Sequence, residues 1–294
     1  MEKKVDRLPV EVFCHDSSEM TDELKLAISQ QYCRFIKSTC VKPRKSEPSV
    51  KVGICSLGAT VARQQEIQPV IICPQRFKED NVFEILRQKY LSDWENVKWV
   101  KEVDIGVGGS VDYVAIELSR NNKITNFQCF EIQAAGTTGT PYPAVLDLKR
   151  YGHYPSDKKY SYGINWANEF SKTMMQQAYK KGKIVETWKR KIVFVVQDVA
   201  MAYLTSSSDC SLLVDYDKSL PVDFFSLKMK WLEDAKEWTL IFDDIKSTSV
   251  DGINRILGGA AVEEYLTETE FVSKIMEKAI SDGVISDNRL YFDF

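Results

Sequence analysis

Three apolar segments rich in β-branched and aromatic residues follow one another along the chain, at residues 97–105, 111–118 and 124–132. Short connections at residues 106–109 and 120–123 join them. This pattern predicts three consecutive β-strands, the last two of which form a hairpin. Because such strands must share one sheet, they constrain the fold more than any other feature of the sequence.

Helical periodicity appears in other parts of the chain. Asp80 is a plausible N-cap for the helix expected at residues 80–90, and Gly182 is expected to end the helix at residues 165–181. Thr267 opens a C-terminal helix in which Glu270 completes a capping box. The other expected helices cover residues 18–37, 80–90 and 165–181. The further expected strands are residues 50–54, 69–73, 191–199, 224–232 and 238–245, with a loop at 42–49. Because strands and helices do not alternate with a regular βαβ period, we expect an α/β fold with a mixed β-sheet flanked by helices.

Composition excludes several classes of protein. With 294 residues, 44% of them hydrophobic, the chain is long enough for a sizeable core. No window of about 18 uninterrupted apolar residues and no secretion signal is present, so we expect a soluble, cytoplasmic protein without a membrane partner. The net charge of −3 gives by itself no reason to expect a nucleic acid partner.

One basic cluster nevertheless stands out. It suits either a row of DNA phosphates or a solvated helix end, and the sequence alone leaves both interpretations open. Its members are Lys180, Lys181, Lys183, Lys189, Arg190 and Lys191.

Histidine is scarce, because the chain contains only 2. A His-rich metal site is therefore excluded, and no Ser-His-Asp arrangement is convincing. Carboxylates must carry any acid, base or metal chemistry.

Asp112 lies at the start of one predicted strand, while Glu131 and Gln133 lie near the end of its hairpin partner. Residues two apart on a strand face the same side, and the hairpin register can bring Asp112 beside them. Oxygen ligands of this kind suit Mg²⁺, which promotes phosphodiester hydrolysis. A solvated outer face is the alternative interpretation. The apolar residues around these carboxylates favour the metal site, since burial of unpaired charge is costly.

The pattern of Asp followed by Glu-x-Gln on the next strand resembles the PD-(D/E)xK nuclease core, with Gln in place of the usual Lys. The chain resembles more narrowly the NotI group of type II restriction endonucleases. The residues that carry this resemblance are Gly53-Ile54-Cys55-Ser56, Ile72-Cys73-Pro74-Gln75-Arg76-Phe77, Val111-Asp112-Tyr113, Phe130-Glu131-Ile132-Gln133 with the following Gly136-Thr137-Thr138-Gly139-Thr140, and Gly163-Ile164-Asn165-Trp166.

The resemblance implies a homodimeric restriction endonuclease that cuts double-stranded DNA at a short, GC-rich palindrome, with a cognate DNA methyltransferase as its companion. Asp112 and Glu131 would then bind Mg²⁺, Glu102 would assist, and Gln133 would position the attacking water. Asp104 competes with Glu102 for the assisting role, since the spacing does not separate the two. The literal Asp-x-Lys at residues 147–149 lacks a strand context, and we set it aside.

Cysteine usage adds a second possible metal site. The chain has 7 cysteines, and spacing alone favours buried free thiols. The resemblance implies that four of them, Cys14, Cys40, Cys55 and Cys73, bind a structural iron or zinc ion. The others, Cys33, Cys129 and Cys210, are then ordinary core thiols. We accordingly expect an N-terminal four-cysteine metal-binding region at residues 1–78 and an endonuclease core at 79–294.

Two alternatives to restriction remain at this stage. The first is another nuclease task on the same fold, such as repair or modification-dependent defence. The second is a catalytically inactive DNA-binding module.

Overall fold

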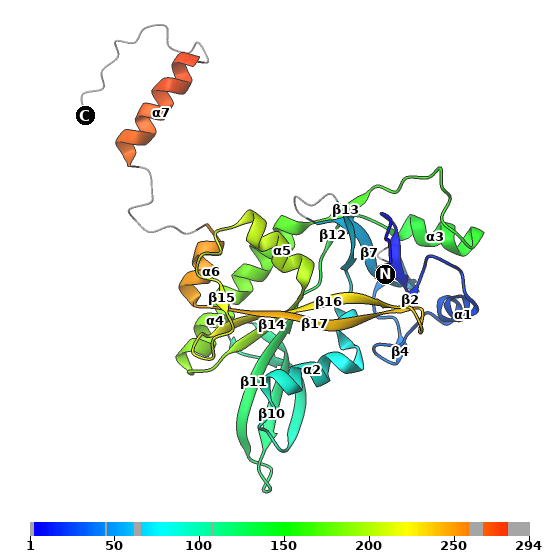
Figure 1. Ribbon diagram of the computed structural model, residues 1–294, viewed down its shortest axis with the longest axis horizontal. Helices are drawn as coiled ribbons and strands as arrows, with labels where there is room; N and C mark the ends of the chain where they lie inside the picture. Colours follow the sequence, from blue (N-terminus) through cyan, green and yellow to red (C-terminus); the bar gives the residue numbers. More distant parts are fainter. Residues whose placement is uncertain (1–2, 45, 62–65, 107–108, 259–266, 282–294) are drawn as a thin grey trace. The chain divides into compact units, whose positions relative to one another are not determined.

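The three predicted strands form one side of a seven-stranded sheet in the computed structural model (Figure 1). They are β9 (Val97–Asp104), β10 (Ser110–Leu118) and β11 (Ile124–Ile132). The rest of the sheet comprises β14 (Ile192–Gln197), β16 (Val222–Leu232), β17 (Glu237–Thr248) and β15 (Val214–Asp215), in the order β15-β17-β16-β14-β11-β10-β9. Strand β14 runs parallel to β11 and β16, whereas the outer pairs are antiparallel. The predicted mixed sheet is confirmed.

The structure describes residues 3–44, 46–61, 66–106, 109–258 and 267–281. Tertiary contacts divide the chain into two units, residues 1–257 and 258–294. The seven-stranded sheet belongs to the first unit, and helix α7 (Glu268–Ser281) belongs to the second. The proposed division at residue 78 stays a prediction.

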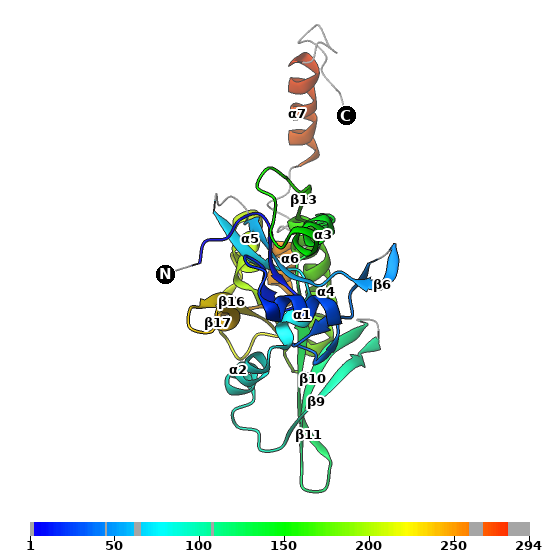
Figure 2. The same cartoon turned by 90° about the vertical axis from the view of Figure 1, so that its right-hand side faces the viewer.

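Helices cover both faces of the central sheet. Every residue of β14 is therefore buried, although successive side chains point to opposite sides. Phe194 and Val196 pack with helices α4, α5 and α6, while Val193 and Val195 pack with helix α2. Figures 1 and 2 show α2 and the other three helices on opposite sides of the sheet. The helices are α2 (Asp80–Tyr90), α4 (Met175–Thr187), α5 (Asp198–Ser207) and α6 (Val250–Ile256). This arrangement confirms that helices flank the mixed sheet.

The N-terminal segment forms a separate four-stranded sheet in the order β2-β1-β7-β8. Its strands are β1 (Pro9–Val12), β2 (His15–Asp16), β7 (Ile54–Thr60) and β8 (Ile67–Ile71). Gln197, at the end of β14, accepts a hydrogen bond from the Ile71 N–H at 2.8 Å and donates one to the Pro69 carbonyl at 2.6 Å. The two sheets are therefore joined where β11 and β14 end.

Shorter elements complete the chain. The helices are α1 (Asp22–Gln30), η1 (Pro74–Lys78) and α3 (Tyr142–Tyr151). The hairpins pair β3 (Tyr32–Cys33) with β4 (Ser38–Thr39), β5 (Pro43–Arg44) with β6 (Glu47–Lys51), and β12 (Thr137–Gly139) with β13 (Tyr162–Ile164). Among the described residues, no helix combines the length and apolar character needed to span a bilayer.

The expected helix at residues 165–181 is wrong at its end. A π-helical segment, η3 (Ala167–Met174), leads directly into α4, which continues through Gly182 to Thr187. A Cβ atom at Gly182 would lie 2.7 Å from Val222 Cγ2 on β16. The glycine therefore permits close packing of helix on sheet and does not end the helix.

Other helix boundaries follow local signals to different extents. The helix expected at 18–37 is only α1, because Gln31 adopts a left-handed conformation with φ 51° and ends it. Asp80 is the first residue of α2 and not its cap, since Glu79 occupies the cap position. The capping box at α7 is confirmed: Glu270 N–H donates to Thr267 Oγ1 at 3.3 Å, and Thr267 N–H donates to Glu270 Oε2 at 2.8 Å.

Candidate active site

The carboxylates of Asp112 and Glu131 meet where the β10–β11 ladder ends. The Ile132 N–H donates to Asp112 Oδ2 at 2.8 Å, and the Asp112 N–H donates to Glu131 Oε2 at 3.3 Å. Each carboxylate thus accepts a hydrogen bond from the backbone of the opposite strand. The hairpin register, in which Tyr113 pairs with Phe130, brings the two side chains together as the sequence predicted.

Glu131 is buried, with an exposed fraction of 6%. Burial and, next, the charge of Asp112 raise the pKa of Glu131, while the ammonium of Lys181 opposes this shift. Its neighbours Phe130 and Ile132 pack into the core on the α2 side of the sheet. The site therefore concentrates negative charge in an environment where water screens it poorly, which favours the binding of a cation.

Gln133 follows two residues after Glu131, and its backbone N–H extends the sheet by donating to the Val195 carbonyl at 3.0 Å. Its side-chain amide donates to the Ala134 carbonyl at 3.1 Å. The amide lies at the end of the strand, and it is half-buried.

Glu102 and Asp104 differ in their surroundings, although both are exposed. The pairs Lys101–Tyr113 and Val103–Val111 place Glu102 across from Asp112. Asp104 instead accepts a hydrogen bond from the Gly106 N–H at 2.8 Å, which stabilises the turn after β9. Glu102 also has a left-handed φ of 53°, a strained conformation for a residue other than glycine. Of the two, only Glu102 lies across from Asp112 in the strand register.

Lys181 is a side chain at this site that sequence reasoning missed. It lies on α4, has an exposed fraction of 3%, and donates from Nζ to Glu131 Oε1 at 2.6 Å. The sequence grouped Lys181 with a surface cluster, and that interpretation is wrong for this residue. The signal was present only as helical periodicity, because Lys181 falls three residues after Ala178 and four before Val185, both buried.

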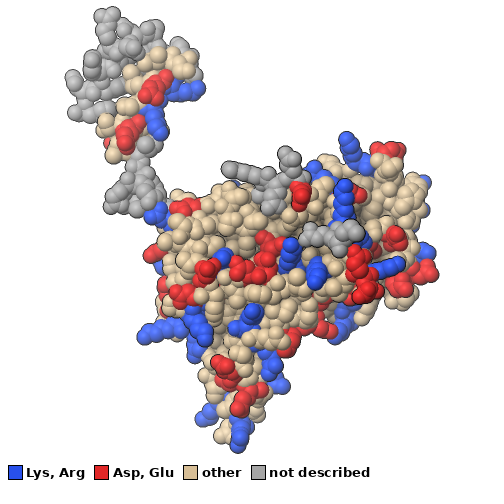
Figure 3. Space-filling view, viewed as in Figure 1, with Lys and Arg blue, Asp and Glu red and all other residues tan. Residues whose placement is uncertain are grey.

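The remaining basic residues of that cluster lie in different surroundings. Lys180, Lys183 and Lys189 are exposed. Arg190 contacts Asn126 Oδ1, and Lys191 Nζ lies 2.6 Å from Asp223 Oδ1. In the face drawn in Figure 3, Lys and Arg side chains are interspersed with Asp and Glu, and no wide basic patch is visible.

Two N-terminal cysteines lie beside Cys14. Its Sγ lies 3.5 Å from Cys33 Sγ and 3.9 Å from Cys55 Sγ. Burial raises the pKa of Cys73, and the nearby Cys40 and Cys33 add to this effect. Cys33, expected to be an ordinary core thiol, is buried in the core and also lies beside Cys14, and all five thiols are buried.

Two cysteines lie outside this group. Burial raises the pKa of Cys129 to about 11, and Glu131 contributes to the shift. Cys210 is half-buried, near the end of α5.

Within the residues that the structure describes, no group of three or more His, Cys, Asp or Glu side chains is arranged to hold a metal ion.

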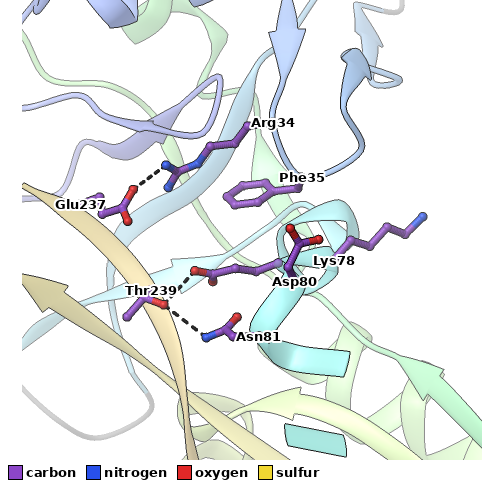
Figure 4. A pocket seen from close by; sticks show the side chains of 8 residues that line it. Arg34, Phe35, Lys78, Asp80, Asn81, Glu237 and Thr239 are labelled. Atoms are coloured by element: carbon purple, nitrogen blue, oxygen red, sulfur yellow. Dashed lines mark hydrogen bonds and ion pairs between the residues drawn. The ribbon is translucent and has the colours of Figure 1, made fainter. Parts of the chain in front are cut away.

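A cavity of about 410 Å³ is lined by residues of η1, α2 and β17 and by Arg34 and Phe35, which follow Cys33 in the chain (Figure 4). Several of its charged groups are already paired: Arg34 with Glu237 at 2.5 Å, Asp80 with Lys37 at 3.2 Å, and Glu79 with the hydroxyl of Thr239 at 2.7 Å. We therefore regard it as a junction between elements. The Asp-x-Lys sequence that was set aside lies within helix α3, where Asp147 pairs with Lys158.

Comparison of the chain with protein-family models gives no match, and a search among curated proteins finds no relative. The functional assignment therefore depends on the geometry and on the resemblance of the short motifs.

Proposed function

We propose that the chain is a Mg²⁺-dependent type II restriction endonuclease with a PD-(D/E)xK core, which hydrolyses both strands of double-stranded DNA. The observation that supports this most is the pair of interlocked carboxylates, Asp112 and Glu131, where the β10–β11 ladder ends and Glu131 is buried. A homodimer, a short GC-rich palindrome and a companion methyltransferase are parts of the same proposal.

The donor set fits Mg²⁺ because it consists of carboxylate oxygens, and this ion fills its remaining positions with water and phosphate oxygens. Asp112 and Glu131 would hold the ion, which supplies Lewis-acid activation of the phosphodiester and of the attacking water. Glu102, across from Asp112, would assist. Gln133 would orient the water through its amide, since glutamine cannot accept a proton at neutral pH.

Digestion of one sequenced plasmid with Mg²⁺ tests the proposal. Discrete fragments with ends at one short palindrome support restriction. Fragments that depend on DNA damage or base modification would indicate another nuclease task. Intact DNA with a gel shift would identify a DNA-binding module and overturn the catalytic assignment.

We also propose that Cys14, Cys40, Cys55 and Cys73 bind one structural iron or zinc ion. The distance between two thiolates of a tetrahedral zinc site is about 3.8 Å, given Zn–S bonds of about 2.3 Å. The contacts of Cys14, at 3.5 Å to Cys33 and 3.9 Å to Cys55, lie near that value. They support a thiolate site and make Cys33 a competitor of Cys40 for the fourth position.

Purified protein is expected to contain about one iron or zinc ion per chain, retained after dialysis against a mild chelator. Cys55→Ser should release the ion and lower the melting temperature, because ion binding is coupled to folding of this segment. Elemental analysis and thermal unfolding measure the two effects.

Cys210→Ser serves as the control and should leave both quantities unchanged. The same measurements on Cys33→Ser and Cys40→Ser decide which thiol completes the site. Metal-free protein with undiminished stability would return the five cysteines to ordinary core thiols.

A further inference from the structure

Lys181 carries a positive charge into the interior of the molecule and uses all its donors there. Its Nζ donates to Glu131 Oε1 at 2.6 Å, to the Ser110 carbonyl at 2.8 Å and to Gln177 Oε1 at 3.3 Å. A lysine ammonium has three N–H donors. Each donor has one acceptor, so the side chain is held in one position.

Burial of the ion pair between Lys181 and Glu131 has a cost in free energy. Desolvation of an ammonium and a carboxylate costs several kcal/mol each, and a well-packed apolar pair is often at least as stable. Lys180 and Lys183, on the same helix, keep their charges in solvent. Lys181 offsets the buried charge of Glu131, but stability alone gives little reason for placing this ion pair inside the fold.

The ammonium acts on one oxygen of one carboxylate. Lys181 binds Glu131 Oε1, while Glu131 Oε2 accepts the Asp112 N–H at 3.3 Å. The Glu131 carboxylate is thus restrained at both oxygens. With both carboxylates ionised and Lys181 charged, the three side chains carry a net charge of about −1, which leaves attraction for a divalent cation.

We propose that Lys181 is a positioning residue for Glu131, which holds its carboxylate in the orientation that binds the catalytic cation. This inference rests on the proposed nuclease function. It gives helix α4 a part in the active site, although α4 is remote in sequence from the two strands that bear the carboxylates. Lys181 does not contact DNA in this role, because it is buried.

The test compares Lys181→Met with Lys181→Arg, and uses Lys183→Met as a matched control on the exposed side of the same helix. Two measurements are made: binding of Mn²⁺ without DNA, followed by its paramagnetic signal, and steady-state cleavage of plasmid DNA with Mg²⁺. Loss of a residue that orients a metal ligand typically weakens metal affinity or activity by about 10- to 100-fold.

We expect Lys181→Met to weaken Mn²⁺ binding by at least about tenfold and to lower kcat, with KM for DNA little changed. Lys181→Arg should recover part of both losses, because it keeps the charge. Lys183→Met should match the wild type. If Lys181→Met does not fold, Gln177→Leu, which removes one restraint on the ammonium, should show a smaller loss in the same direction.

Wild-type Mn²⁺ affinity in the folded Lys181→Met protein, or in Gln177→Leu if that variant replaces it, would overturn the inference and leave the nuclease proposal intact. A raised KM with unchanged kcat would also overturn it, since that pattern indicates a DNA contact. Wild-type protein without any Mn²⁺ binding that depends on Glu131 would overturn both proposals.

Discussion

Glu131→Gln is expected to lower the rate of plasmid cleavage by at least about a thousandfold, because a metal ligand in this role contributes several kcal/mol to the transition state. Glutamine retains the shape of the side chain and an oxygen that accepts from Lys181, which lies 2.6 Å from Glu131 Oε1. The fold should therefore survive while the negative charge is lost. Single-turnover cleavage at saturating Mg²⁺ measures the effect.

Binding of the same DNA without Mg²⁺, followed by gel shift, should be unchanged in Glu131→Gln. Glu186→Gln is the matched control, since Glu186 is exposed on α4. It should cleave at the wild-type rate. Cleavage by Glu131→Gln within about tenfold of the wild type would contradict the assignment of Glu131 as a metal ligand.

Arg76→Met is expected to lower the free energy of unfolding by about 3–5 kcal/mol, because it leaves the buried carboxylate of Glu11 without its cationic partner. Arg76 is fully buried. Its Nε lies 3.0 Å from Glu11 Oε1, Nη1 pairs with Glu79, and Nη2 donates to the Trp238 carbonyl at 2.9 Å. The guanidinium thus connects β1 of the N-terminal sheet with the start of α2 and with β17 of the central sheet.

Thermal unfolding should report a melting temperature lower by roughly 6–20 °C in Arg76→Met. Arg87→Met, a change at an exposed position of α2, is the control and should have little effect. The double variant Glu11→Met with Arg76→Met should lose less than the sum of the single variants, since fewer buried charges remain unpaired. Additive losses would show that the two side chains are not coupled.

The sequence was sufficient to predict the elements whose signals are local. Strands β9, β10 and β11 lie within one residue of their expected bounds, because alternating apolar residues and short connections specify a meander directly. The α7 capping box depends on two residues three positions apart. Asp112 and Glu131 could be paired for the same reason, since the register of a short hairpin follows from its turn.

Sequence reasoning failed where a residue's role is set by a distant partner. Gly182 has the local signature of a helix end, yet Val222 of β16 lies where its Cβ would be. Cys33 matches no motif, although folding brings its sulfur to within 3.5 Å of Cys14. In both cases the contact joins segments that are distant in sequence, and hydrophobic periodicity does not show that they lie close together.

Lys181 shows the difference most clearly. Its place in a run of basic residues predicts a solvated surface, and only the packing of α4 on the sheet turns it toward Glu131, 50 residues earlier in the chain. The sequence alone thus determined strands β9, β10 and β11 and the pairing of Asp112 with Glu131, through hydrogen-bonded register over a few residues. Tertiary structure decided the charge that faces them, because a buried ammonium takes its position from whichever acceptors the packed helix and sheet bring within about 3 Å.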